Sequence, residues 1–511
     1  MIRRIARCIH TSDRFLGLAV LATLLVRLFL LSNYYCISID GVSYVGAAKD
    51  LYAGNLRAAL SSVYPPGYPA LIAVFYSFLR DWEWAGQMIS LVAGVGLLFP
   101  LYGLLRSIYG TPVARIGCFL AAINPYLALY SVHVRAESIF IFLSVLALYV
   151  FHRGVERRRV SDFIAGGLIA SVAYLVKPEA IGFVIMIPSV LVILWWTRRE
   201  WEFAYVARAS AGLLMGFLLF ATPYIVYLSS ATGQWGTLSR KAGVTLAVSL
   251  RESGLLDDDI LTEFPTRESM SLPEFVADHP WVYTKKFFIE LAFLVPTYLE
   301  ALYYSYAPFV LIGLFGFFCA RPWERKDFLL LVYLIFFSLA FTAIYLNRRY
   351  LVQVVPISMG WTAIGMVCCW NWAKRNWSET TTRVAMFTAT AVFLAVTLPK
   401  TLKPVSQEKK YLKEAGQYIR QLYGPGHLSI MVSDSRIAFY AGADRVSMPK
   451  LSKSDVMAQL RERKIEFLAA ETIWLKKRYP MILDSVGTYG FQLVKEFAGR
   501  DRNRLVVYRR S

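Results

Sequence analysis

The chain has 511 residues, of which 57% are hydrophobic and only 18% are charged, and its mean hydropathy is +0.46. This composition excludes a soluble globular protein, because no soluble protein of this size needs so much apolar surface. The net charge of +20 does not indicate nucleic-acid binding, because the excess lysines and arginines lie mostly in short connections between apolar runs, where membrane orientation accounts for them.

Apolar runs long enough to cross a membrane recur along the chain. A helical span needs about 20 consecutive apolar residues. The first run resembles a signal peptide, but no small-residue cleavage site follows it, so we expect an uncleaved span. About eleven transmembrane helices are predicted, at residues 14–36, 86–106, 114–132, 136–152, 162–176, 179–196, 208–229, 301–320, 327–346, 350–371 and 384–401.

Basic residues alternate between the connections of these spans. The N-terminus and every second connection are rich in arginine and lysine, whereas the other connections are poor in cations or acidic. Cytoplasmic loops carry this excess of positive charge, so the pattern predicts a cytoplasmic N-terminus in the cytoplasmic membrane. Two long segments, 37–85 and 230–300, are then predicted to be external, and an odd number of spans puts the C-terminus outside as well.

The last hundred residues have a different composition. A helical pattern at 408–422 is followed by short apolar runs of β type at 428–432 and 504–508. We therefore expect a polytopic α-helical membrane protein with external interfacial helices and a small C-terminal α/β domain. The predicted division is 1–404 for the membrane domain and 405–511 for an external, periplasmic domain.

Asp40 follows the first span at the outer interface and opens a helical pattern. One interpretation is an Asp-Gly turn that caps the helix. The other is a general base at the membrane surface, because an attacking sugar-acceptor hydroxyl must lose a proton and a fixed carboxylate can accept it.

Four further places carry polar groups at the predicted outer face. The segment 64–69 holds three prolines after Tyr64 and predicts a rigid entry into the next apolar stretch. Arg135 and Glu137 open the fourth span, as an ion pair or as substrate contacts. Lys177 lies in the next outer turn, either as an anchor at the interface or as a ligand for substrate.

The fourth of these places is the run Arg348, Arg349 and Tyr350 after the ninth span. Paired arginines outside the membrane oppose the usual orientation bias and need compensation. A phosphate group supplies it, because a guanidinium donates two hydrogen bonds to phosphate oxygens. Ionisable groups at an apolar boundary are costly, which favours a functional role.

In this order, these residues resemble the C-type (GT-C) superfamily of polytopic glycosyltransferases, which includes protein O-mannosyltransferases and lipid A aminoarabinose transferases. The resemblance covers most of the membrane region and extends into the tail. It rests on Asp40, on Tyr64-Pro65-Pro66-Gly67-Tyr68-Pro69, on Arg135-Ala136-Glu137-Ser138, on Arg349-Tyr350 followed by Pro356, and on Ala438-Phe439-Tyr440-Ala441-Gly442.

The resemblance implies an inverting transfer of a sugar from a polyprenyl-phosphate donor to a lipid, glycan or protein acceptor. It implies that Asp40 is the catalytic carboxylate of the first external loop. Relatives often have an acidic pair there, whereas Gly41 follows Asp40 here. Aminoarabinose transferases have a lysine before the two prolines that contacts the donor phosphate, where this chain has Tyr64. That contact is then replaced either by a hydrogen bond from the Tyr64 hydroxyl or by the charge of Arg135, Lys177, Arg348 or Arg349.

Two questions stay open at this stage. Asp40 either acts without a divalent ion or ligates one together with Asp50 or Glu137, and no cysteine pattern indicates a zinc site. The alternative functions are a transporter or flippase for a lipid-linked saccharide and a membrane scaffold. A transporter predicts charges deep in several spans or repeated halves, but only Arg27 is deep and no internal repeat is evident.

Overall fold

The computed structural model divides the protein into two compact units. The first comprises Met1–Leu28 and Ala47–Leu402, and the second comprises Phe29–Gly46 and Lys403–Ser511. The structure describes residues 14–198, 201–233, 235, 237–255, 272–316, 327–424, 428–447, 465–478, 490–499 and 503–510. Each unit is described by itself below.

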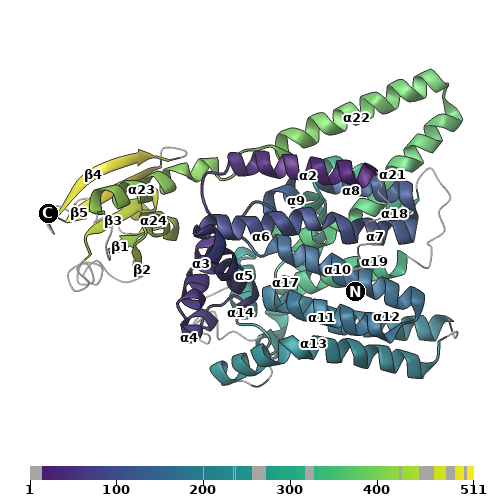
Figure 1. Ribbon diagram of the computed structural model, residues 1–511, viewed down its shortest axis with the longest axis horizontal. Helices are drawn as coiled ribbons and strands as arrows, with labels where there is room; N and C mark the ends of the chain where they lie inside the picture. The colour runs from purple at the N-terminus through teal and green to yellow at the C-terminus, as the bar shows by residue number, and fades with distance from the viewer. Residues whose placement is uncertain are drawn as a thin grey trace. The chain divides into compact units, whose positions relative to one another are not determined.

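The described part of the first unit is helical (Figure 1). Two of its helices continue into the second unit, α2 (Arg14–Ser32) and α3 (Ile39–Tyr52). The other helices are α4 (Leu56–Leu60), α5 (Gly67–Leu79), α6 (Trp82–Gly96), α7 (Leu98–Tyr109), α8 (Thr111–Ile123), α9 (Pro125–Tyr130), α10 (Glu137–Arg157), α11 (Val160–Val176), η1 (Pro178–Ile181), α12 (Gly182–Arg198), α13 (Phe203–Thr232), α14 (Lys241–Glu252), α16 (Leu272–Asp278), α17 (Pro280–Leu302), η2 (Tyr304–Tyr306), α18 (Ala307–Phe315), α19 (Phe328–Ile344), α20 (Arg348–Leu351), η4 (Val352–Val354), α21 (Val355–Asn376) and α22 (Glu379–Thr401).

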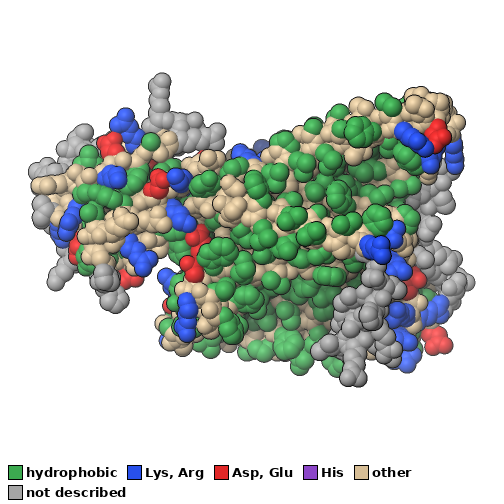
Figure 2. Space-filling view, turned by 45° about the horizontal axis from the view of Figure 1, so that its top comes forward, with side chains coloured by type: hydrophobic (Ala, Val, Ile, Leu, Met, Phe, Trp, Pro, Cys, Tyr) green, Lys and Arg blue, Asp and Glu red, His purple; other side chains and the backbone are tan. Residues whose placement is uncertain are grey.

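The surface of the helical unit is apolar. Figure 2 shows hydrophobic side chains covering much of the helical surface in this view. Phe220, Phe288 and Ile335 are among the large hydrophobic residues of the unit that are exposed. Large contiguous apolar surfaces are unfavourable in water but match a hydrocarbon environment. Seven described helices are long and apolar enough to cross a membrane, or eight if one bent pair counts as a single span. The predicted class, a polytopic helical membrane protein, is confirmed.

Every predicted span overlaps a described helix, but the lengths and ends of several helices differ from the prediction. Four apolar helices have only 10–17 residues: α5, α8, α11 and α19. The predicted eighth span at 301–320 corresponds, in its described part, to the end of α17, η2 and α18, and α17 is bent against the helix that follows it by 95°. Tyr303 makes this break, with a left-handed φ of 79°. The segment expected to be an external loop up to residue 300 therefore already contains α17.

Small residues let neighbouring helices approach closely. A methyl group on Gly313 of α18 would overlap the carbonyl of Trp361 on α21, and one on Gly365 would overlap the carbonyl of Phe309. Backbones in van der Waals contact are a common way to hold helices together where there is no hydrophobic effect between them. α18 and α21 are therefore packed backbone to backbone at these glycines.

The second unit contains a mixed five-stranded sheet in the order β2-β1-β3-β5-β4. β1 pairs in parallel with β2 and β3, whereas β5 pairs antiparallel with β3 and β4. The helix expected at 408–422 and the strands expected at 428–432 and 504–508 correspond to α23, β1 and β5. The elements are η5 (Gln407–Lys409), α23 (Lys410–Tyr423), β1 (Ser429–Val432), α24 (Ser435–Ala441), β2 (Asp444–Ser447), β3 (Phe467–Glu471), α26 (Thr472–Arg478), β4 (Phe491–Ala498) and β5 (Arg504–Arg510).

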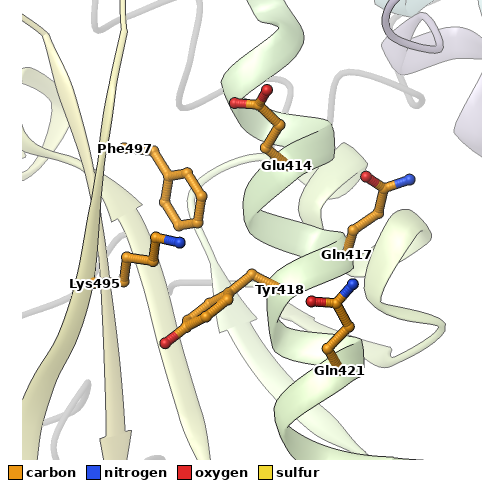
Figure 3. A pocket seen from close by; sticks show the side chains of 6 residues that line it. All are labelled: Glu414, Gln417, Tyr418, Gln421, Lys495 and Phe497. Atoms are coloured by element: carbon orange, nitrogen blue, oxygen red, sulfur yellow. The ribbon is translucent and has the colours of Figure 1, made fainter.

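A surface hollow lies between α23 and β4 in this unit (Figure 3). Tyr418 meets Phe497 edge to face, with ring centres 5.8 Å apart, and the Lys495 ammonium lies 4.5 Å from the centre of the Tyr418 ring. These contacts hold α23 against the exposed edge strand of the sheet. The residues that line the hollow are Glu414, Gln417, Tyr418, Gln421, Lys495 and Phe497.

A segment far away in sequence belongs to the same unit. Tyr34 forms a parallel bridge with Val405, whose N–H donates to the Asn33 carbonyl at 2.9 Å. The Tyr35 N–H donates in turn to the Val405 carbonyl at 3.0 Å. The linker after the first helix is thus paired with the chain that enters the C-terminal domain, which the sequence pattern did not predict.

Candidate active site

Glu137 lies at the centre of a buried ionic cluster in the first unit. It occupies the first turn of α10 and is only 2% exposed. The Nε of Arg349 donates to its carboxylate, and the Nζ of Lys177 lies 3.9 Å from the same oxygen, Oε1. Arg135 also interacts electrostatically with this carboxylate. Three of the cations expected at the outer face therefore meet around one buried acid.

Local structure explains why these side chains point to one place. Lys177 stands at the end of α11 and Glu137 at the start of α10, so both lie where a helix reaches the same end of the bundle. Asn347 caps α20 by accepting a hydrogen bond of 3.0 Å from the Arg349 N–H. An N-cap side chain fixes the first turn of a helix, and here that turn carries both arginines.

The Tyr350 ring extends the cluster. The Lys177 ammonium lies 4.9 Å from the centre of this ring, and Lys177 also lies 3.5 Å from the carboxylate of Glu179. A cation over an aromatic face is attracted by the ring's quadrupole, more strongly where water is excluded. Tyr350 therefore holds Lys177 beside Arg349, and the uncharged ring does not neutralise the charge of Lys177.

Lys241, which was not predicted to be a site residue, reaches the same ring. Its ammonium lies 5.5 Å from the centre of the Tyr350 ring and 5.2 Å from that of Tyr64. Lys241 opens α14, and the neighbouring Arg240 donates to the Ser61 carbonyl at 3.0 Å, which ties this helix to the segment before Tyr64. A lysine from a distant part of the sequence thus lies beside Tyr64.

Arg348 turns to different partners. It forms an ion pair with Glu300, and its guanidinium lies over the Tyr126 ring at 4.6 Å and donates to the Tyr126 hydroxyl at 3.2 Å. Its positive charge is therefore largely compensated by Glu300. The two adjacent arginines, predicted to act together, have separate surroundings.

A second buried pair supports the loop before the arginines. Lys286 and Glu290, one helical turn apart on α17, lie 3.2 Å apart and are buried. Lys286 also donates to the carbonyls of Thr342 and Ala343, and Glu290 accepts from the Leu346 N–H at 2.7 Å. This pair therefore holds the chain between α19 and α20, the segment that precedes Arg349.

The cluster around Glu137 has an excess of positive charge. Four cations, Arg135, Lys177, Lys241 and Arg349, stand near two carboxylates, Glu137 and Glu179, which leaves two positive charges in excess. Within the described residues, Arg135 Nε and Glu137 Oε2 are buried without a hydrogen-bond partner. Buried polar atoms are usually satisfied, so the site can form further hydrogen bonds to a ligand. Its chemistry suits an anion such as a phosphate.

Asp40 belongs to the second unit. It lies in the first turn of α3 and is half-buried. The Ser38 side chain caps this turn by accepting from the Gly41 N–H at 3.0 Å. The residue that caps the helix is thus Ser38, whereas the Asp-Gly interpretation had assigned that role to Asp40. The role of Asp40 as a general base stays a prediction.

Metal ligands were left open by the sequence. In the part of the chain that the structure describes, no three His, Cys, Asp or Glu side chains are grouped closely enough to hold an ion. Divalent cations usually take several oxygen ligands from protein and substrate.

A protein-family model matches residues 63–227 and is described as dolichyl-phosphate-mannose-protein mannosyltransferase. These residues include Tyr64, Arg135, Glu137 and Lys177. A search among curated protein sequences found no significant match.

Solved structures share the fold over almost the whole chain. ArnT from Cupriavidus metallidurans is 14% identical in its apo state, with a TM-score of 0.60 and coverage of 98% of both chains. Its structure with bound undecaprenyl phosphate gives a TM-score of 0.58 over 97% of this chain and 98% of that one. The archaeal oligosaccharyltransferase AglB from Archaeoglobus fulgidus, solved with an inhibitory peptide and a dolichol-phosphate, is 12% identical with a TM-score of 0.57, covering 91% of this chain and 70% of that chain.

Proposed function

We infer that this chain moves a sugar from a polyprenyl monophosphate to an acceptor at the outer face of the cytoplasmic membrane. It is a polytopic membrane glycosyltransferase of the C-type (GT-C) fold and uses a lipid-linked donor. The acceptor is a lipid, a glycan or a protein. The observation that carries the donor assignment is the cluster of Arg349, Lys177 and Lys241 around Glu137 and Tyr350. The alternating loop charges support the outer location.

The cluster fits a phosphate as leaving group. A sugar phosphodiester carries one negative charge, and breaking its glycosidic bond leaves a phosphate monoester that gains a second. Cations already in position stabilise charge that develops in the transition state, with little cost for reorganisation. Arg349 and Lys177 are held by Glu137, and Lys241 is held by the Tyr350 ring, so all three are oriented before the substrate binds.

Asp40 is the proposed general base. It takes the proton from the acceptor hydroxyl while the hydroxyl oxygen attacks the anomeric carbon opposite the phosphate. The new glycosidic bond forms as the bond to phosphate oxygen breaks, which inverts the anomeric centre. The phosphate leaves as an anion, so one carboxylate suffices, unlike the two that glycosidases need.

Catalysis by Asp40 is tested by purifying Asp40→Asn and measuring sugar transfer from a panel of polyprenyl-phosphate sugars. The amide cannot accept the proton, so we expect a loss of roughly 100-fold or more in kcat, in the range typical of general-base removal. Glu156, an exposed residue near the end of α10, supplies the matched control Glu156→Gln, which removes one carboxylate and should keep full activity. Undiminished kcat in Asp40→Asn rules out its catalytic role.

The donor class is tested separately by release of polyprenyl phosphate. The wild-type enzyme should release it from a polyprenyl-phosphate sugar only when an acceptor is present, and Arg349→Ala should require far more donor. An enzyme that moves the intact donor between leaflets without breaking its glycosidic bond would be a flippase instead, and this outcome would reject the proposal.

A further inference from the structure

We propose that the hydroxyl of Tyr440 positions the catalytic loop by anchoring the backbone just before Asp40. The inference rests on the proposed function, because Asp40 is the residue that would be positioned. The anchor itself is an observed contact within the second unit: the Ile37 N–H donates to the Tyr440 hydroxyl oxygen at 2.7 Å. The two residues are 403 positions apart in the chain.

The Ile37 amide has few alternative hydrogen-bond partners at this point of the chain. Cys36, Ile37 and Ser38 are all buried, so the Ile37 amide cannot exchange its partner for bulk water. A buried amide without a partner is unfavourable, and this contact therefore constrains the backbone. Three residues later the chain reaches Asp40.

The contact is the second of two anchors on the same short segment. The first is the bridge of Tyr34 and Tyr35 with Val405. Immediately after Ile37, the Ser38 hydroxyl accepts from the Gly41 N–H at 3.0 Å and starts α3. Residues 34–38 are therefore tied down at both ends, and the orientation of the first turn of α3 follows from them.

Tyr440 is itself held rigidly. It lies on α24 and is 8% exposed, and the Lys413 ammonium lies 4.8 Å from its ring centre. α24 packs closely on α23 at Gly416, where a methyl group would come within 2.6 Å of the Ile437 carbonyl oxygen. The hydroxyl is thus fixed by the fold of the C-terminal domain, and this gives that domain a role in the reaction.

Tyr440→Phe removes one oxygen and keeps the ring that packs in the domain. We expect kcat per folded molecule to fall roughly 10-fold, because one buried hydrogen bond of ordinary strength holds the loop. The KM for the lipid donor should stay within about twofold, because the donor phosphate contacts lie on other residues. Amide hydrogen exchange in peptides covering 33–46 should become faster, and other peptides of the domain should not change.

Tyr418→Phe is the matched control. It removes the same atom from the same domain, at a ring that contacts Phe497 and Lys495 (Figure 3). Within the described residues, the Tyr418 hydroxyl forms no hydrogen bond. This variant should retain wild-type kcat and exchange.

The outcomes separate the anchor from the proposed function. Unchanged exchange at 33–46 in Tyr440→Phe overturns the anchor, and so does a loss of activity that is explained wholly by a smaller folded fraction. Full activity of Asp40→Asn instead removes the proposed base, while faster exchange in Tyr440→Phe would still establish the anchor.

Discussion

Lys177 and Lys241 approach the same aromatic ring, that of Tyr350, with their ammonium groups 4.9 and 5.5 Å from its centre. They come from the end of α11 and the start of α14. Two like charges near one ring repel each other, and the carboxylates of Glu137 and Glu179 beside Lys177 offset this repulsion only in part, because the cluster keeps an excess of positive charge. If the donor phosphate binds there as proposed, we expect it to relieve this repulsion.

Replacing the ring should weaken donor binding. Tyr350→Leu removes the aromatic face, and we expect the KM for the polyprenyl-phosphate sugar to rise roughly 3- to 30-fold, which corresponds to the range of a desolvated cation–π contact. Tyr350→Phe keeps the face and should remain near wild type. Equal effects of the two variants in steady-state kinetics would show that the hydroxyl, not the ring, is the important group.

Lys241 should contribute to phosphate binding although it lies far from the other cations in sequence. Lys241→Ala should raise the donor KM roughly 10-fold or more, as expected when one partner of a charge-assisted contact is lost. The matched control is Lys285→Ala, because Lys285 is also a lysine of the first unit but is exposed. If both variants bind the donor equally well in titrations, only the overall positive charge of the unit affects binding, and the position of Lys241 has no particular importance.

The alternating loop charges placed Glu137, Lys177 and Arg349 on one side of the membrane, and the structure brings these three together. Local sequence patterns are enough to predict the side of the membrane for these residues, because each of them stands at the end of an apolar run. Lys241 carries no such signal: it is one lysine in a polar segment, and its place depends on how α14 folds against Tyr64 and Tyr350. Sequence periodicity reports neighbours within an element, not contacts between distant ones.

Two features of the fold were missed for related reasons. The break between α17 and α18 occurs at Tyr303, which adopts a left-handed φ of 79° without being glycine, so no turn residue indicates it. The pairing of Tyr34 with Val405 joins opposite ends of the sequence. Such non-local backbone pairing leaves no mark in composition, whereas the amphipathic helix α23 and the apolar strands β1 and β5 were visible in the sequence.

Breaking the buried pair on α17 should destabilise the first unit. Lys286→Met leaves the carboxylate of Glu290 without its nearest cation, and removing one member of a buried pair typically costs about 3–5 kcal/mol. We expect a clear drop in the thermal unfolding midpoint in detergent. The double variant Lys286→Met/Glu290→Leu removes both charges and should recover part of the stability. A single variant as stable as wild type would mean that the pair does not support the loop before Arg349.

The Asp434–Arg436 pair should make the second unit sensitive to acid. Burial raises the pKa of the Asp434 carboxyl, but two hydrogen bonds from Arg436, at 2.9 and 2.6 Å, outweigh it, so the folded pKa lies below its ordinary value. Because the folded pKa is depressed, the stabilisation is fully present above the unfolded pKa of about 3.9 and is lost as the pH falls through the folded value.

Asp434→Asn tests this linkage, because the amide does not titrate. At neutral pH the variant should lose about 2 kcal/mol, the usual contribution of hydrogen bonds to a charged group. Between pH 6 and strong acid, its unfolding midpoint should fall less steeply than that of the wild type, and the two curves should converge at low pH. Glu496→Gln, which alters an exposed pair with Arg504, is the control and should follow the wild-type curve. Parallel curves for Asp434→Asn and wild type would show that this carboxyl keeps its ordinary pKa in the folded protein.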